Sequence, residues 1–180
     1  MIPIAVDVMG GDFAPRAIVE GVSQALDGPA PCGPLILVGD RDRVNTELER
    51  VGRLGDPNLE VLHAEDVIRM DDPASTALRS KRKSSITLAV EQVKKGRAGA
   101  VFSAGHTGAA VASTVVKLRP LPGIERPGIA TVFPAPKGHF VLLDAGANVD
   151  CKPSHLVQYA IMGEVYAREI LGHSSPRIGL

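Results

Sequence analysis

The segment VFSAGHTGAAVAS, residues 101–113, changes from an apolar run typical of a buried strand to an alanine-rich stretch typical of a helix. Gly105 and Gly108 stand at the change, where glycine permits a positive φ and lets another group approach the main chain closely. The helix that follows, with Thr107 as its expected N-cap, directs unpaired N–H groups toward the same place. The junction is therefore a candidate anion site, and a tight turn without a ligand is the alternative.

Strand-like and helix-like segments alternate on both sides of this junction. The expected strands are 2–8, 35–38, 59–62, 99–103, 129–133 and 140–143, and the expected helices are 15–26, 42–51, 84–95, 107–118 and 153–171. Prolines and a glycine between the last two strands indicate a hairpin or a crossing loop, and PRIGL at 176–180 opens a further strand. The alternation predicts an α/β fold, a largely parallel sheet with helices on both faces.

The chain shows no internal repeat and no domain linker, so we expect residues 1–180 to be the N-terminal portion of a single α/β domain. The expected strand at the end of the sequence suggests that the chain is cut at Leu180.

Composition excludes several classes of protein. Twenty basic residues balance twenty acidic ones, aromatic residues make up 3%, and Trp is absent, which argues against a nucleic-acid binder. We find neither a signal peptide nor an apolar run long enough for a membrane helix. Cys32 and Cys151 are too far apart in sequence for a zinc pattern and too few for a disulfide framework. These features predict a reduced, soluble, cytoplasmic protein without a metal site.

Three glycine-bearing loops follow strands and lead into helices: DVMGGDFAP at 7–15, SAGHTGA at 103–109 and LLDAGANVDCKP at 142–153. Ligands of open α/β sheets gather beyond the carboxyl ends of the strands, so we expect one shared site for an anionic ligand. Helix capping and turns are the alternative for its aspartates. The candidate binding residues in these loops are Gly10, Gly11, Asp12, Ser103, Gly105, Thr107, Gly108, Asp144, Gly146 and Lys152. Neither GxGxxG after the first strand nor GxxxxGK[ST] occurs.

A basic segment, ALRSKRKSSITLAVEQVKK at 77–95, places cations directly before a helix whose expected N-cap is Ser84 or Ser85. Cations at a helix N-terminus oppose the macrodipole unless an anion lies between them. A phosphate or an acidic partner would explain the four cations, and a solvated basic loop is the alternative. They are Arg79, Lys81, Arg82 and Lys83.

Five segments in collinear order, AVDVMGGDFAP (5–15), RSKRKSS (79–85), VFSAGHTGA (101–109), IERPGIATVFP (124–134) and LLDAGANVDCKPSHLVQYAIMGEVYA (142–167), resemble the phosphate acyltransferase family. That family makes acyl phosphate from acyl-acyl-carrier protein and inorganic phosphate for phospholipid synthesis. The resemblance implies a fold similar to isocitrate and isopropylmalate dehydrogenases and to phosphotransacetylases, a longer chain, a homodimer and no cofactor. It also implies peripheral membrane association through parts outside this chain. His106 stands where the family usually has Asn.

The implied reaction needs little acid–base help, because phosphate is already anionic and a thiolate leaves readily. The site must hold phosphate against the carbonyl carbon and stabilise the oxyanion with placed donors. The expected catalytic residues are His106, Lys81, Lys83 and Asn148, with His106 as a donor and Asn148 orienting the acyl group. Ser84 and Ser85 are further donors, and Asp7 or Asp144 would fix the basic side chains.

Other functions stay open. A phosphotransacetylase-like enzyme acting on acyl-CoA would need a similar site, and a non-catalytic binding module is a third possibility. An acyl-enzyme at Cys151 lacks an identifiable activating base.

Overall fold

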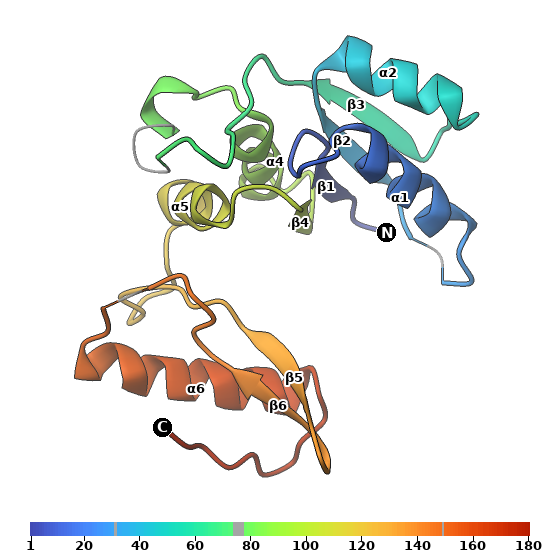
Figure 1. Ribbon diagram of the computed structural model, residues 1–180. Coiled ribbons are helices and arrows are strands. Elements are labelled where there is room, and N and C mark those ends of the chain that lie inside the picture. Colours follow the sequence, from blue (N-terminus) through green and yellow to red (C-terminus); the bar gives the residue numbers. More distant parts are fainter. Residues whose placement is uncertain (31, 74–77, 149) are drawn as a thin grey trace. The chain divides into compact units, whose positions relative to one another are not determined.

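The computed structural model describes residues 1–30, 32–73, 78–148 and 150–180, and it divides the chain into two compact units, Met1–Arg119 and Pro120–Leu180 (Figure 1). Each unit is described by itself, and the expected single domain stays a prediction.

The first unit contains a four-stranded parallel sheet in the order β3-β2-β1-β4. Its strands are β1 (Ile4–Asp7), β2 (Leu35–Gly39), β3 (Leu59–His63) and β4 (Ala100–Ser103), and its helices are α1 (Arg16–Asp27), α2 (Arg41–Arg50), α4 (Ser85–Lys94) and α5 (Thr107–Leu118). These elements begin and end within two residues of the ranges expected from the sequence.

Helices cover both faces of this sheet, as Figure 1 shows. Val6 and Leu37, which are paired in register, point to one face and pack with Val19 of α1 and Val44 of α2. Side chains alternate along a strand, so the neighbouring residues of β1 and β2 point to the other face, where they pack with Ala89 of α4. Two buried faces explain the continuous apolar run of β2 and confirm the α/β fold class.

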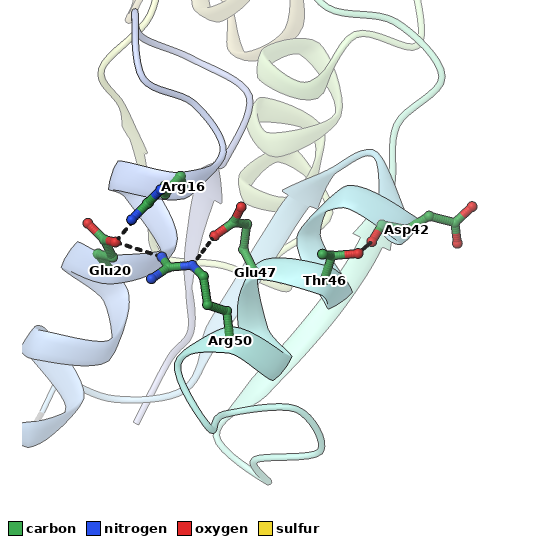
Figure 2. A network of polar contacts seen from close by, with 6 residues as sticks. All are labelled: Arg16, Glu20, Asp42, Thr46, Glu47 and Arg50. Carbon is green, nitrogen blue, oxygen red and sulfur yellow. Dashed lines mark hydrogen bonds and ion pairs between the residues drawn. The ribbon is translucent and has the colours of Figure 1, made fainter.

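Ion pairs join the solvent sides of α1 and α2 (Figure 2). Glu20 accepts hydrogen bonds from Arg16 and Arg50, and Arg50 also donates to Glu47 at 2.6 Å. The bonds from Arg16 and Arg50 lower the pKa of Glu20. Because these groups are exposed, the network adds little to stability.

The second unit contains a β-hairpin and one long helix. Strands β5 (Thr131–Ala135) and β6 (Gly138–Leu142) pair antiparallel, and α6 spans Pro153–Glu169. The hairpin alternative is therefore the right one, and β5 begins two residues later than expected because the turn lies at 136–137, before Gly138 with φ +99°. The expected strand at 176–180 is wrong, since this segment pairs with no strand in the described part of the chain.

None of the described helices combines the length and the apolar character needed to cross a lipid bilayer.

Candidate functional site

Gly10 and Gly105 bring the loops after β1 and β4 into backbone contact. A Cβ on Gly10 would lie 2.8 Å from the amide nitrogen of Gly105, and a Cβ on Gly105 would lie 2.9 Å from Cα of Gly10. The positive φ that glycine permits is not adopted at Gly105 or Gly108, whereas Gly11 in the loop after β1 has φ +107°. The group that excludes a side chain at Gly105 is therefore the main chain of the other loop.

A cavity of about 190 Å³ lies beside this crossing and is lined by Met9, Gly11, Asp12, Val67, Ile68, Arg69, Met70, Gly105 and His106. Pockets for drug-sized ligands are roughly 300–1,000 Å³, so this cavity is smaller than such pockets. The cavity therefore suits a small ion, and of the candidate residues from the sequence it collects Gly11, Asp12, Gly105 and His106.

His106, not Thr107, is the N-cap of α5, which corrects the expectation from the sequence. Its Nδ1 accepts a hydrogen bond from the amide of Ala109 at 3.3 Å, and its Nε2 lies 3.1 Å from the carbonyl oxygen of Asp72. Because Nδ1 accepts, we assign the proton to Nε2, which donates to Asp72. Sequence reasoning preferred Thr because hydroxyls are common caps, but an imidazole nitrogen accepts the same bond.

Thr107 and Gly108 form the exposed first turn of α5 and do not line the cavity. In the described part of the chain, their N–H groups meet no acceptor, as is usual for a first helical turn.

The lysines of the basic segment are paired with acidic groups of the chain itself. Lys81 binds the carboxylate of Asp72 and the carbonyl oxygen of Val67, and Lys83 binds Glu65 at 2.7 Å. The hydrogen bond from Lys81 lowers the pKa of Asp72, and the bond to Glu65 raises the pKa of Lys83. These two lysines before α4 are thus compensated without an external anion, and Lys81 anchors one wall of the cavity through Val67.

Ser84 and Ser85 are buried, with exposed fractions of 0% and 1%. Ser84 occupies the N-cap position of α4, but its hydroxyl donates to Oγ1 of Thr87 at 2.8 Å instead of capping a backbone N–H. Neither serine lines the cavity.

The remaining predicted residues lie in the loop before α6. Asp144 accepts hydrogen bonds from the amides of Ile129, Ala147 and Asn148 and from the side chain of Asn148. Burial opposes the charged form of Asp144, but these bonds outweigh it and lower the pKa. Both side chains hold the loop together, and Gly146 provides its positive φ of +101°.

Lys152 is exposed and occupies the N-cap position directly before α6. Its backbone amide donates to Nδ1 of His155, whose Nε2 lies 3.1 Å from a carboxylate oxygen of Glu125. The sequence-predicted residues are thus divided between the two units, and their union in one site stays a prediction.

Sequence reasoning missed part of the cavity wall. No sequence motif marks Arg69 or Met70 as part of a site. The one available indication is that they follow β3 in the sequence, after the carboxyl end of a strand. Within the described ranges, His, Cys, Asp and Glu side chains form no group of three or more that would hold a metal ion.

The comparisons agree with this fold and with the family expected from the sequence. Residues 2–180 match the family described as "Fatty acid synthesis protein". A phosphate acyltransferase from Trichlorobacter lovleyi is 51% identical over 98% of this chain and 50% of its own length, and one from Thermodesulfovibrio yellowstonii is 50% identical over 100% of this chain and 51% of its own.

Among solved structures, the EutD phosphotransacetylase from Staphylococcus aureus matches with a TM-score of 0.64 and 14% identity, over 92% of this chain and 52% of that one. This likeness establishes a shared fold. The chain spans about half the length of the curated relatives it matches. With a family match from residue 2 to residue 180, the chain belongs to the fatty acid synthesis protein family.

Proposed function

We propose that the protein containing this chain transfers a fatty acyl group from acyl-acyl-carrier protein to inorganic phosphate and so supplies acyl phosphate for phospholipid synthesis. The observation that carries the proposal is the identity of about 50%, along nearly the whole chain, to proteins named phosphate acyltransferase. The small cavity beside the Gly10–Gly105 crossing supports it, because its size suits phosphate better than an acyl chain.

In this reaction a phosphate oxygen attacks the thioester carbonyl carbon, the C–S bond breaks, and the thiolate leaves. Arg69 would supply positive charge in the cavity wall, and Gly11 and Gly105 would let phosphate approach the main chain. Catalysis would then come mainly from holding phosphate in place and from stabilising the oxyanion.

The test uses the full-length protein with acyl-acyl-carrier protein, and it follows the release of carrier thiol with and without phosphate. We expect release only with phosphate, together with acyl phosphate detectable by mass spectrometry. Equal release without phosphate would indicate a hydrolase, and neither release nor phosphate binding would indicate another function.

A phosphotransacetylase-like enzyme acting on acyl-CoA is the second candidate, and the shared fold with a phosphotransacetylase supports it. The same assay with acyl-CoA at matched concentration separates the two. Higher kcat/KM with the carrier protein supports our proposal, and higher kcat/KM with acyl-CoA supports the alternative.

We further propose that the full-length protein is a cytoplasmic homodimer that associates peripherally with membranes through parts outside this chain. Light scattering tests the dimer, and co-sedimentation with anionic vesicles tests the membrane contact.

A further inference from the structure

Buried Asp7 and half-buried Ser103 form a polar pair next to the contact between the two glycine loops. They are partners in the register of β1 and β4, at the last position of each strand. The hydroxyl of Ser103 donates to Oδ2 of Asp7 at 2.7 Å. Residues separated by 95 others along the chain therefore meet in one hydrogen bond at the edge of the sheet where the cavity lies.

Asp7 and Ser103 also contact the loops that follow β1 and β4. Oγ of Ser103 also accepts the amide hydrogen of Gly105 at 3.1 Å, so the serine links the carboxyl group to the loop. A Cβ on Gly10 would lie 2.7 Å from Oδ2 of Asp7, which shows how closely the first loop rests on this oxygen. The carboxyl group thus touches both loops at their point of contact.

The burial of Asp7 is costly, which suggests that the residue has a specific role. Its side chain is only 3% exposed, and Oδ1 has no hydrogen-bond partner among the described residues. Burial raises the pKa of this carboxyl group, and hydrogen bonds from the side chains of Ser85 and Ser103 and from the backbone of Met9 and Gly10 only partly oppose the rise. A buried polar atom without a partner is unfavourable, so a residue kept only for stability would be better replaced by an apolar one.

Neither residue lines the cavity, but the loops that they hold do. Gly11 is the neighbour of Gly10, which contacts Gly105. Gly105 donates to Ser103, and His106 is the next residue in the chain. A shift of the crossing would therefore move three wall residues together.

We propose that Asp7 and Ser103 are positioning residues for the phosphate of the acyl transfer proposed above, and that their hydrogen bond fixes the glycine-loop crossing that forms the cavity wall. The inference rests on that function. In this proposal the pair does not touch substrate. Asp7 and Ser103 influence phosphate binding through the positions of Gly11, Gly105 and His106.

The test compares two variants that break the bond with two that keep it, all in the full-length protein. Ser103→Ala and Asp7→Ala remove it, whereas Ser103→Thr keeps the hydroxyl and Asp7→Asn keeps an acceptor oxygen. A displacement of about 1 Å in a reacting group can lower rates roughly 100-fold, so we expect kcat/KM for phosphate to fall about 10- to 100-fold in the first two variants.

A positioning role predicts which kinetic constant changes when kcat/KM for phosphate falls. The KM for phosphate should rise, while the KM for the acyl donor at saturating phosphate stays within about threefold of the wild type. Ser103→Thr and Asp7→Asn should restore most of the activity. The double variant Asp7→Ala/Ser103→Ala should lose little more than Asp7→Ala alone, because the bond to Ser103 is already absent in that single variant.

Another serine of the same unit, more deeply buried than Ser103, supplies the control. Ser113 on α5 is 1% exposed, and its hydroxyl has no partner among the described residues. Ser113→Ala should leave both KM values unchanged.

Thermal melting with inorganic phosphate gives a readout that is independent of turnover. Bound phosphate raises the melting temperature of the wild type and of Ser113→Ala, and we expect this rise to be lost in Ser103→Ala. If Ser103→Ala does not fold, Ser103→Cys replaces the hydroxyl with a weakly bonding thiol of similar size and is expected to show the same loss.

The outcomes separate this inference from the proposed function. A wild type without phosphate-dependent thiol release overturns the function, while the melting experiment still tests the positioning. An active wild type whose Ser103→Ala variant keeps its KM for phosphate overturns the inference, as does a double variant whose losses are additive. A lower kcat with both KM values unchanged would mean a smaller folded fraction and would also overturn it.

Discussion

At the scale of single residues, the crossing of Gly10 and Gly105 is the tightest fit of main chain against main chain among the described glycines. A Cβ at either position would lie less than 3.0 Å from main-chain atoms of the other loop. A side chain could relieve such a contact by changing its rotamer, but the main chain cannot. We expect Gly10→Ala and Gly105→Ala each to lower the free energy of unfolding by about 1–3 kcal/mol, the usual cost of overpacking. Urea denaturation measures this effect.

Gly21 provides the contrast for these substitutions. It lies inside α1, and a Cβ there would meet nothing within 4 Å. Gly21→Ala should raise stability by about 0.5–1 kcal/mol, because alanine is the better helix residue. A loss of stability at Gly21 equal to that at Gly105 would contradict the crossing as the cause.

Two aspartates should respond to pH in opposite directions. The pKa of Asp144 lies below its ordinary value of 3.8, so its contribution to stability is present above the unfolded pKa and is lost as pH falls through the folded one. The pKa of Asp7 lies above 3.8, so its ionisation costs stability as pH rises from the unfolded toward the folded pKa.

Asp144→Asn should therefore cost more stability at pH 6 than at pH 3, whereas Asp7→Asn should become relatively more favourable over the same rise. Urea denaturation of both variants between pH 3 and pH 7 gives the two slopes. Slopes of the same sign would refute this assignment.

At the scale of elements, the start of α5 depends on the imidazole of His106. His106→Ala removes the cap on Ala109 and the bond to Asp72, and we expect a loss of about 0.5–2 kcal/mol. His106→Asn keeps a cap acceptor and should cost less. Asp40→Ala, which removes the cap of α2 on Arg43, is the matched control and should cost a similar amount without altering the KM for phosphate.

The regular elements could be predicted because their signals are local. The apolar run of β2 and the helical spacing of α1 each lie within about a dozen residues. The prediction of a strand at 176–180 is wrong because strand formation does not depend on local signals alone. A strand also needs a partner strand, and a local sequence pattern does not show whether one is present.

The site was predictable only in outline. Glycines and polar residues after strands directed attention to the carboxyl edge of the sheet, where the cavity lies, and the role of these residues as a site stays a prediction. The sequence could not show that Gly105 meets Gly10, or that Lys81 meets Asp72, because these contacts depend on strand order and on the path of the loops. For the same reason His106 was expected to be a donor to substrate, although its two nitrogens bind the chain itself.

At the scale of the whole molecule, the two units differ in their cores. The three clusters of buried apolar residues described here all lie in the first unit. In the second unit, the described residues that are buried are His155, Tyr159 and Ala167. We expect residues 1–119 alone to unfold cooperatively in urea, as monitored by circular dichroism. Residues 120–180 alone should show no cooperative transition, because so short a segment buries too little surface. A sharp transition in the shorter fragment would contradict this expectation.

The place of β4 beside β1 also has a consequence for the order of events during synthesis. Strands β1, β2 and β3 are complete once residue 63 has been made, but β1 keeps an unpaired edge until β4 follows some 37 residues later. Contacts between residues so distant in sequence form slowly, because the intervening chain must first be ordered. The cavity, whose wall includes the loop after β4, is therefore among the last features of the first unit to form, and a nascent chain that ends before residue 100 exposes a parallel strand edge open to pairing with other chains.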